Sequence, residues 1–282
     1  MSRKLISIII PTYNRSKSLP LSIKSVLDQT RDNWELIIID DGSEDSTQEV
    51  LKDYLNDDRI KYYYQENQGV SVARNSGAKL ATGDYLIFLD SDDIFFPDLI
   101  KNIYEAEFYK YDLICWQVLK NIDGKEKIWK PQQLDGMYNN INATFLAGSI
   151  CFKKSIFLKS GGYDPKMSFG ENYELGMSVC EQTNLKIKSI NKPLLYYEIQ
   201  TQNRDSNSIK NRLSSYIHQY KKHKAKYDRN LKAKAEMNYI LGFVLEKSNR
   251  KSAALAQFKN SWMSNPWRLK PLLKIIYLKL FR

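Results

Sequence analysis

Four short and mostly apolar runs in the first 90 residues restrict this chain to few folds. They span residues 5–10, 35–39, 60–64 and 85–89, and segments with helical periodicity separate them. Runs of this kind are typical of parallel strands that are covered on both faces. Strands that alternate with helices are joined by right-handed crossovers. We therefore expect an open α/β sheet.

Helix signals lie between these runs. From residue 19 apolar side chains recur at helical spacing, with Pro20 near the start of the pattern. Ser46 and Glu49 have the spacing of a capping box for a second helix, and residues 70–80 predict a third. The second helix is expected to bury four apolar side chains: Val50, Leu51, Tyr54 and Leu55.

Polar and acidic side chains follow three of the runs. Residues 11–14 (Pro-Thr-Tyr-Asn) follow the first, 40–43 (Asp-Asp-Gly-Ser) follow the second, and 90–93 (Asp-Ser-Asp-Asp) follow the fourth. In open α/β sheets, ligands bind beyond the carboxyl ends of the strands. These residues therefore predict a ligand site along one edge of the sheet.

The tetrad at residues 90–93 favours a metal. Its three carboxylates repel one another unless a cation lies among them. Magnesium and manganese ions typically take one or two carboxylates together with substrate phosphates, which suits a nucleotide diphosphate. The alternative is that Asp92 or Asp93 caps the next helix, with Pro97 in its first turn. Capping needs only one carboxylate, so the metal site is the stronger prediction.

The other strand ends suggest a nucleotide. The Asp-Gly pair at residues 41–42 is favourable in turns, but a carboxylate there can also accept the imide N–H of a pyrimidine base. Tyr13 could stack on the same base. Arg74 would either pair with a surface carboxylate or bind the diphosphate with two hydrogen bonds.

The later part of the chain is less regular. Residues 113–142 carry Gly124, Pro131 and Gly136, and they predict strands and loops that could form the wall of an acceptor cleft. Two short strands are expected further on, at residues 186–190 and 193–199.

Four motifs, in order and at the expected spacing, resemble family 2 glycosyltransferases with the GT-A fold. They are residues 7–14 (SIIIPTYN), 39–43 (IDDGS), 73–77 (ARNSG) and 88–93 (FLDSDD), and a Gly-Gly-Tyr-Asp segment follows at 161–164. The resemblance covers about residues 4–200. It implies a Rossmann-like, mostly parallel open sheet with flanking helices.

The resemblance also implies an activity, which is an inverting transfer of a sugar from a nucleotide-sugar to an acceptor hydroxyl. The donor would be a UDP-sugar, as is usual in the family, and the acceptor a glycan or a lipid-linked glycan. Mg²⁺ or Mn²⁺ would stabilise the departing diphosphate as a Lewis acid. Carried over by position, the nucleotide would contact Pro11, Tyr13, Asp41, Arg74 and Asp90, and the metal would contact Asp92 and Asp93.

The position of the catalytic base departs from the family. Inversion needs a base that takes the acceptor proton, usually the Asp of a Glu-Asp pair, but the pair here is Glu171-Asn172. A neutral amide cannot take that role. Glu171 is the expected base, with Glu174 as the alternative if the pair is shifted. The chain could instead bind a nucleotide-sugar with little or no transfer, or Asn172 could be an engineered change. Gln200 stands where the family often has a histidine.

Charge is distributed unevenly along the chain. The net charge is +11, made of +15 in residues 200–282 and −4 before them. We predict a catalytic domain over residues 1–202 and a basic helical extension over residues 203–282. Residues 268–282 combine large apolar side chains with cations and no acid, so they would contact an anionic membrane surface or dock on the preceding helices. Nucleic acid is disfavoured, because no binding motif is present.

Cysteine usage indicates a reducing compartment. The three cysteines are odd in number and far apart, so they fit neither a disulfide framework nor a zinc site and are expected to be buried thiols. The apolar run at residues 5–10 is too short for a signal peptide or a membrane span. We expect a cytoplasmic location, at the inner face of the membrane where the extension contacts it. No phosphate-binding glycine loop follows the first strand, which disfavours oxidoreductases and nucleotidyltransferases.

Overall fold

The computed structural model describes residues 4–199 and 208–280, and the chain divides into two compact units. The first comprises Met1–Pro165 and Asn172–Asn203, and the second Lys166–Glu171 and Arg204–Arg282. The boundary predicted after residue 202 lies outside the described residues, and Lys166–Glu171 group with the C-terminal unit. Gln200 lies outside the described residues.

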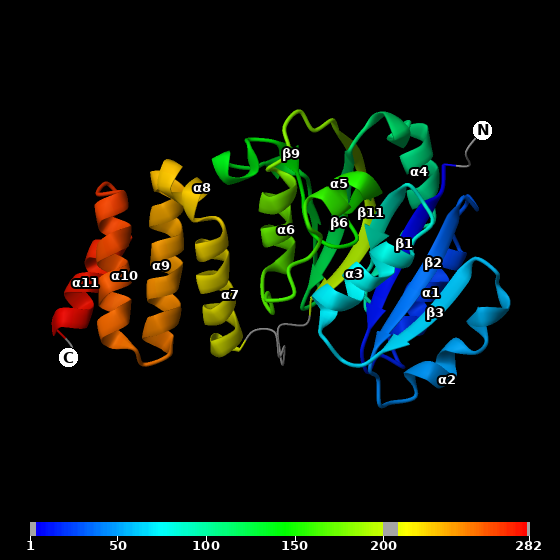
Figure 1. The fold of residues 1–282 in the computed structure, drawn as a ribbon, viewed down its shortest axis with the longest axis horizontal. Coiled ribbons are helices and arrows are strands. Elements are labelled where there is room, and N and C mark those ends of the chain that lie inside the picture. Colours follow the sequence, from blue (N-terminus) through cyan, green and yellow to red (C-terminus); the bar gives the residue numbers. More distant parts are fainter. Residues whose placement is uncertain (1–3, 200–207, 281–282) are drawn as a thin grey trace. The chain divides into compact units, whose positions relative to one another are not determined.

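A mixed sheet forms the centre of the first unit (Figure 1). Over the described residues its strand order is β3-β2-β1-β4-β10-β6-β11-β5, with β7 paired to β6. The strands in the first half are mutually parallel, and β1 pairs with both β2 and β4. The expected parallel α/β arrangement is therefore confirmed for this half. These strands are β1 (Ile6–Thr12), β2 (Trp34–Asp41), β3 (Ile60–Gln65) and β4 (Tyr85–Phe88).

The other half of the sheet contains antiparallel pairs. β10 runs antiparallel to both β4 and β6, whereas β11 runs parallel to β6. The two strands predicted at residues 186–190 and 193–199 are in fact one long strand, whose register shifts around Pro193. Proline has no N–H to donate to the ladder, which explains the irregularity there. The strands of this half are β5 (Ile94–Phe95), β6 (Leu113–Ile122), β7 (Lys125–Trp129), β10 (Ile150–Lys153) and β11 (Ile187–Ile199).

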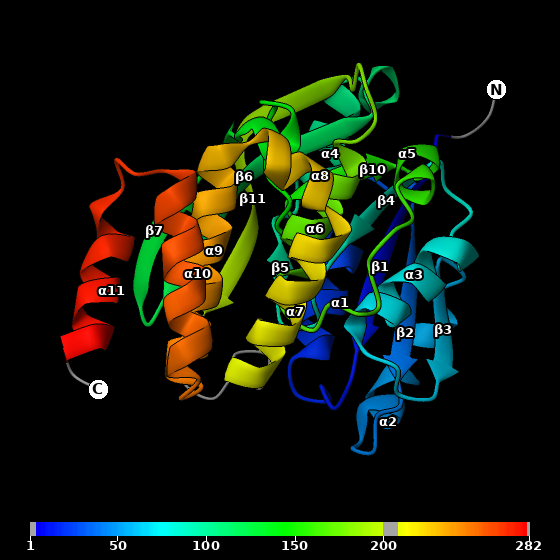
Figure 2. The same ribbon diagram turned by 60° about the vertical axis from the view of Figure 1, so that its left-hand side comes forward.

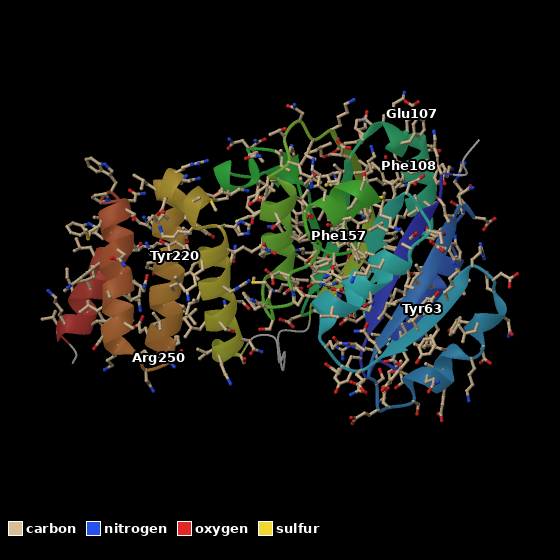
Figure 3. The ribbon with its side chains drawn as sticks, viewed as in Figure 1. Tyr63, Glu107, Phe108, Phe157, Tyr220 and Arg250 are labelled. Atoms are coloured by element: carbon tan, nitrogen blue, oxygen red, sulfur yellow. The ribbon has the colours of Figure 1, made fainter. Side chains whose placement is uncertain are left out.

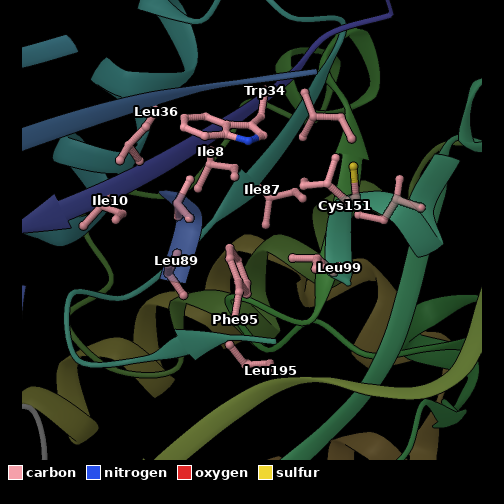
Figure 4. Packing of buried hydrophobic residues seen from close by; sticks show 14 of the residues in the cluster. Ile8, Ile10, Trp34, Leu36, Ile87, Leu89, Phe95, Leu99, Cys151 and Leu195 are labelled. Carbon is pink, nitrogen blue, oxygen red and sulfur yellow. The ribbon is translucent and has the colours of Figure 1, made fainter. Parts of the chain in front are cut away.

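Each face of the sheet has its own apolar core, because successive side chains of a strand point to opposite faces. Ile8 and Ile10 of β1 pack with α1 and α4 on one face, and Figure 4 shows this core around Ile8, Trp34 and Ile87. Ile9 packs with α3, α5 and α6 on the other face. The helices are α1 (Leu19–Leu27), α3 (Val70–Leu80), α4 (Leu99–Glu105), α5 (Lys154–Lys159) and α6 (Glu171–Val179).

Aromatic rings fill the second core. Phe157 of α5 lies in the interior of the first unit (Figure 3). Its ring centroid is 5.0 Å from that of Phe88 and 5.9 Å from those of Phe152 and Tyr163. The three cysteines are buried free thiols, as expected. Burial raises the pKa of the Cys115 thiol to about 12 and that of Cys151 well above its ordinary value.

The capping box predicted at Ser46 is wrong. Ser46 makes no side-chain cap hydrogen bond, and α2 (Thr47–Leu51) ends after five residues. The N–H of Glu49, which a capping box would direct to Ser46 Oγ, donates to the main-chain carbonyl of Ser46 at 3.1 Å. Asp45 Oδ1 accepts from the N–H of Thr47 at 3.0 Å. Leu55, which was expected to be buried, is 42% exposed.

Glu35 at the start of β2 is the centre of a buried hydrogen-bond network. Its carboxylate accepts from Ser7 Oγ (2.7 Å), Lys61 Nζ (2.9 Å), the N–H and hydroxyl of Thr82 (2.6 and 2.8 Å) and the N–H of Gly83 (3.2 Å). Burial alone would raise the pKa of Glu35, but the hydrogen bonds from Lys61, Ser7 and Thr82 outweigh it and lower the pKa to about 2. The charged form therefore stabilises the fold.

Glu35→Gln is expected to lower the free energy of unfolding at pH 7 by about 3 kcal/mol. This is the free energy that corresponds to the difference in pKa between the unfolded and the folded state. Because the pKa is depressed in the folded state, this contribution is present above the unfolded pKa of about 4.5 and is lost as pH falls toward 2. Urea denaturation across this pH range measures it. Glu105→Gln, at an exposed position, is the control. Equal stability of wild type and Glu35→Gln at pH 7 would contradict the prediction.

The second unit consists of helices, which confirms the expected helical extension. α9 packs against α7 and α10, and α10 packs against α11 (Figure 2). Phe258 of α10 is fully buried between these helices. Nowhere in the described residues is a helix both long and apolar enough to cross a membrane. The helices are α7 (Ile209–Lys222), α8 (Lys224–Arg229), α9 (Leu231–Lys247), α10 (Lys251–Ser264) and α11 (Leu269–Leu280).

Candidate functional site

The predicted polar strand ends lie beside one another at one edge of the sheet. Thr12 of β1 is in register with Asp40 of β2, and the N–H of Leu89 donates to the carbonyl of Ile9 at 2.9 Å. The parallel register thus brings the segments after β1, β2 and β4 to the same edge. This is the edge at which open α/β sheets bind ligands.

Asn14 ties the loops after β1 and β2 together. Its Oδ1 accepts from the N–H of Glu44 at 2.8 Å, and its own N–H donates to Ser43 Oγ at 2.9 Å. The φ angle of Asn14 is 52°, a left-handed conformation that asparagine tolerates better than most residues. On this fixed loop the Tyr13 ring is 45% exposed, whereas Pro11 is buried within β1. Of these two residues, only Tyr13 offers an open face to a base.

Asp41 holds the connection between β3 and α3. Its carboxylate is buried and accepts from Gln65 Nε2 (2.7 Å), the N–H of Gln68 (2.9 Å) and the N–H of Gly69 (2.7 Å). A carboxylate offers about four acceptor positions, so about one remains for a ligand. Asp41 can be predicted from the sequence, whereas the loop that it supports cannot.

Arg74 and Asp90, each predicted separately to contact the nucleotide, form an ion pair. Arg74 lies in α3 and is 2% exposed, and its Nη2 lies 2.5 Å from Oδ1 of Asp90, which is 30% exposed. The guanidinium also lies over the ring of Tyr163, with 4.8 Å between its carbon and the ring centroid. Arg74 therefore pairs with a partly exposed carboxylate that belongs to the predicted site.

Tyr163 links this pair to the position of the expected base. Its hydroxyl donates to Oδ1 of Asn172 at 3.0 Å, and its main chain exchanges two hydrogen bonds with the Asn75 side chain, at 2.7 and 2.9 Å. The preceding Gly162 has a φ angle of 70°, and a Cβ there would lie 2.5 Å from Oδ1 of Asn75. Only glycine fits this position. In the sequence the Gly-Gly-Tyr-Asp segment is recognisable only by its resemblance to the family, which does not predict these contacts.

The tetrad forms a turn and does not cap a helix. The N–H of Asp93 donates to the carbonyl of Asp90 at 3.0 Å, and β5 follows at once. The next helix, α4, begins only at Leu99, with Asp98 at its N-cap, so the capping alternative for Asp92 and Asp93 is wrong.

The carboxylates of the tetrad differ in exposure. Asp92 is exposed and Asp93 is 1% exposed. In the described part of the chain, no group of three or more His, Cys, Asp or Glu side chains could hold a metal by itself. The exposed carboxylate of Asp92 fits a hard cation that takes its other ligands from a diphosphate, because Mg²⁺ uses one or two protein carboxylates in such sites.

The candidate bases differ in accessibility. Asn172 is half-buried in the first turn of α6, and Glu171, the first residue of that helix, is also half-buried and groups with the second unit. Glu174 is completely buried and accepts from Ser178 Oγ at 2.8 Å. A base must contact the acceptor hydroxyl, so the burial of Glu174 argues against that role.

A large open cavity lies at the other end of the strands. Its volume is about 1090 Å³, and Lys4, Arg31, Asn33 and Asp84, which line it, precede β1, β2 and β4. This is the amino end of the parallel strands, opposite to the edge at which such sheets bind ligands. The cavity is therefore separate from the candidate site.

Comparisons with known proteins agree with the motifs. A model of glycosyl transferase family 2 matches residues 7–162. An uncharacterized glycosyltransferase from Haemophilus influenzae is 28% identical over 208 residues, which cover 70% of this chain and 69% of that protein. The putative teichuronic acid biosynthesis glycosyltransferase TuaG of Bacillus subtilis is 45% identical over 93 residues, 32% of this chain and 37% of TuaG. An uncharacterized glycosyltransferase from Rickettsia conorii is 51% identical over 96 residues, which cover 34% of this chain but only 16% of that protein.

Solved structures share the fold. S. aureus TarS 1–349 superposes with a TM-score of 0.69 at 17% identity, over 98% of this chain and 87% of that one. The same protein in complex with UDP-GlcNAc gives a TM-score of 0.62 at 16% identity, over 97% and 79%. The expected GT-A class, with an α/β sheet and flanking helices, is thereby confirmed. Because the family model matches more than half of the residues of the chain, the chain belongs to glycosyl transferase family 2.

Proposed function

We propose that this chain transfers a sugar, with inversion, from a nucleotide-sugar to a hydroxyl of a glycan or a lipid-linked glycan. The observation that carries the proposal is the connected series Asp90, Arg74, Tyr163 and Asn172, which reaches from the tetrad to the position of the base. The TarS structures solved with UDP-GlcNAc and with UDP support a UDP-linked donor, since they share this fold.

Each strand end has a proposed role toward the donor. Tyr13 stacks on the base, and the remaining acceptor position of Asp41 takes the imide N–H of a pyrimidine. Arg74, held by Asp90, donates to the diphosphate. Asp92 would hold Mg²⁺ or Mn²⁺, which when bound would act as a Lewis acid toward the leaving diphosphate. Buried Asp93 shapes the turn that presents Asp92, and buried Pro11 lies near the end of β1, two residues before Tyr13.

The identity of residue 172 favours a second function, binding of a nucleotide-sugar with weak or no transfer. The amide of Asn172 cannot accept the proton of the acceptor. In the transferase function Glu171, the neighbouring carboxylate, is the proposed base. Glu171→Gln tests this role, because a variant with wild-type turnover would exclude Glu171 as the base.

The proposed location of the enzyme in the cell follows from the proposed acceptor. A lipid-linked glycan would meet the enzyme at the inner face of the cell membrane, and the buried free thiols are in keeping with a cytoplasmic protein. We propose that the basic C-terminal unit brings the chain to that anionic surface.

The donor site is tested by thermal unfolding in the presence of nucleotide-sugars, with and without Mn²⁺. We expect one nucleotide-sugar to raise the Tm, and Mn²⁺ to increase the shift, because a ligand that binds only the folded state stabilises it. Absence of a shift with every nucleotide and nucleotide-sugar would contradict the proposed function.

Asp92→Asn is expected to weaken donor binding in Mn²⁺ by about tenfold to a hundredfold, because an amide is a poorer ligand for a hard cation than a carboxylate. In EDTA the two proteins should bind the donor equally. Isothermal titration with the donor found in the screen measures both conditions. Asp84→Asn, an exposed aspartate at the other end of β4, is the matched control. A loss of the same size in EDTA would exclude a metal role for Asp92.

A further inference from the structure

Helix α11 has two apolar faces. Pro271, Ile275 and Leu278 are buried in the second unit. Four large apolar side chains of the same helix are exposed, at 65%, 64%, 46% and 72%: Leu269, Leu273, Ile276 and Leu280. A helix that only docked on its neighbours would need one apolar face, so the exposed one requires a separate explanation.

These four residues form one stripe, which we call the α11 stripe. Their spacing of i, i+4, i+7 and i+11 confines them to a sector of roughly 60° of the helix surface, at 100° per residue. Lys270 and Lys279 lie on either side of the sector and are exposed. Two further apolar side chains before α11 are exposed: Trp267, two residues before the helix, at 94%, and Met263, near the end of α10, at 73%.

Docking on the preceding helices is independent of the stripe. Lys274 Nζ lies 2.9 and 2.8 Å from the two carboxylate oxygens of Glu246 in α9, and Arg268 pairs with Glu236 of the same helix. Together with the buried face, these ion pairs account for the position of α11. The docked arrangement considered from the sequence is therefore present, and it leaves the stripe uncovered within the described residues.

Charge decides which partner fits the stripe. Residues 208–280 contain 17 Lys and Arg but only three Asp and Glu. All three carboxylates already pair with cations of the same unit: Asp228 with Lys224 and Lys234, Glu236 with Arg268, and Glu246 with Lys274. A second copy of this unit would bring the same positive excess and repel the first. A surface of anionic phospholipid is complementary in both charge and polarity.

We propose that the α11 stripe, together with Trp267, inserts into the interfacial layer of a bilayer that contains anionic phospholipid. Lys270 and Lys279 would then lie at the level of the headgroups, and the indole of Trp267 at the boundary that tryptophan prefers. The inference rests on the part of the proposed function that brings the C-terminal unit to a membrane, and it names the residues and the lipid class responsible.

Vesicle flotation of the full chain tests the proposal. Leu273→Gln combined with Leu280→Gln is expected to lower the partition coefficient on vesicles of phosphatidylcholine and phosphatidylglycerol by about tenfold or more. Leu21→Gln combined with Leu158→Gln is the matched control, since these leucines are 58% and 48% exposed in the first unit. It should float as wild type does. Thermal unfolding should be unchanged in both double variants, because no buried side chain is altered.

A second flotation experiment varies the charge of the lipid. Wild type should float less with vesicles of phosphatidylcholine alone, and Lys270→Gln combined with Lys279→Gln should weaken binding only where phosphatidylglycerol is present. Lys232→Gln combined with Lys251→Gln, at exposed positions on α9 and α10, should cause a smaller loss.

Three results would overturn the proposal. They are the absence of flotation with any vesicle, equal flotation of wild type and the stripe variant, and a concentration-dependent dimer in sedimentation that the stripe variant abolishes. The last would assign the stripe to a second copy of the chain. The flotation assay contains no nucleotide or acceptor, so a negative result there does not bear on the proposed donor site. A negative donor screen likewise does not bear on membrane binding.

Discussion

In the second proposed function, which lacks a base, replacing Asn172 with aspartate is expected to raise turnover by about two to four orders of magnitude, the usual contribution of a general base. Oδ1 of Asn172 already accepts the hydroxyl hydrogen of Tyr163 at 3.0 Å, and an aspartate of the same shape keeps this bond. The residue lies in the first turn of α6, where the helix dipole favours negative charge. The substitution therefore adds a proton acceptor without altering the packing.

The measurement is the initial rate of nucleotide release by the full chain with the donor found in the thermal screen. Asn172→Ala is the control that removes the hydrogen bond without adding a base, and it should not raise the rate. The rate of Asn172→Asp should fall as the pH is lowered, because protonation removes the base. Turnover equal to that of wild type would mean that the base lies elsewhere, and Glu171→Gln in the same assay would then test the remaining candidate.

The parallel half of the sheet could be predicted because local signals coincide there. β1, β2 and β4 are buried on both faces, and polar segments follow them at the strand ends. β10 could not be placed, because its partners are chosen by long-range pairing. Cys151 of this short strand lies opposite both Ile87 and Ile114. A pattern of four residues cannot reveal that β10 will lie between β4 and β6 and run antiparallel to both.

Residue types at the site were predictable, but their partners were not. The Arg74–Asp90 pair joins residues 16 positions apart, and the Asn75–Tyr163 contacts join residues 88 positions apart. Spacing along the chain carries no signal for contacts of this range. The failure at Ser46 has a different cause, since the N–H of Glu49 donates to the main-chain carbonyl of Ser46 and not to its side chain.

Arg74→Lys is expected to lower kcat/KM by about a hundredfold to a thousandfold, which is typical when a fixed donor to developing charge is lost. The lysine keeps the charge but loses the planar fork of the guanidinium and its face toward Tyr163. A single ammonium would have to replace both the Nη2 contact with Asp90 and the contacts proposed toward the diphosphate. Donor affinity should fall as well, because the proposed contact exists before the transition state.

The change is measured by titration with the donor and, if wild-type turnover is too slow, by rates in the Asn172→Asp background. Arg59→Lys is the matched control. Arg59 also pairs with carboxylates, Asp57 and Asp32, and stacks on Trp34 at 4.0 Å, but it precedes β3, at the opposite end of the strands from the tetrad. It should cost stability without changing donor affinity. Unchanged donor affinity and kcat/KM in Arg74→Lys would restrict Arg74 to holding Asp90 and Tyr163 in place, and the diphosphate would then need another cationic partner.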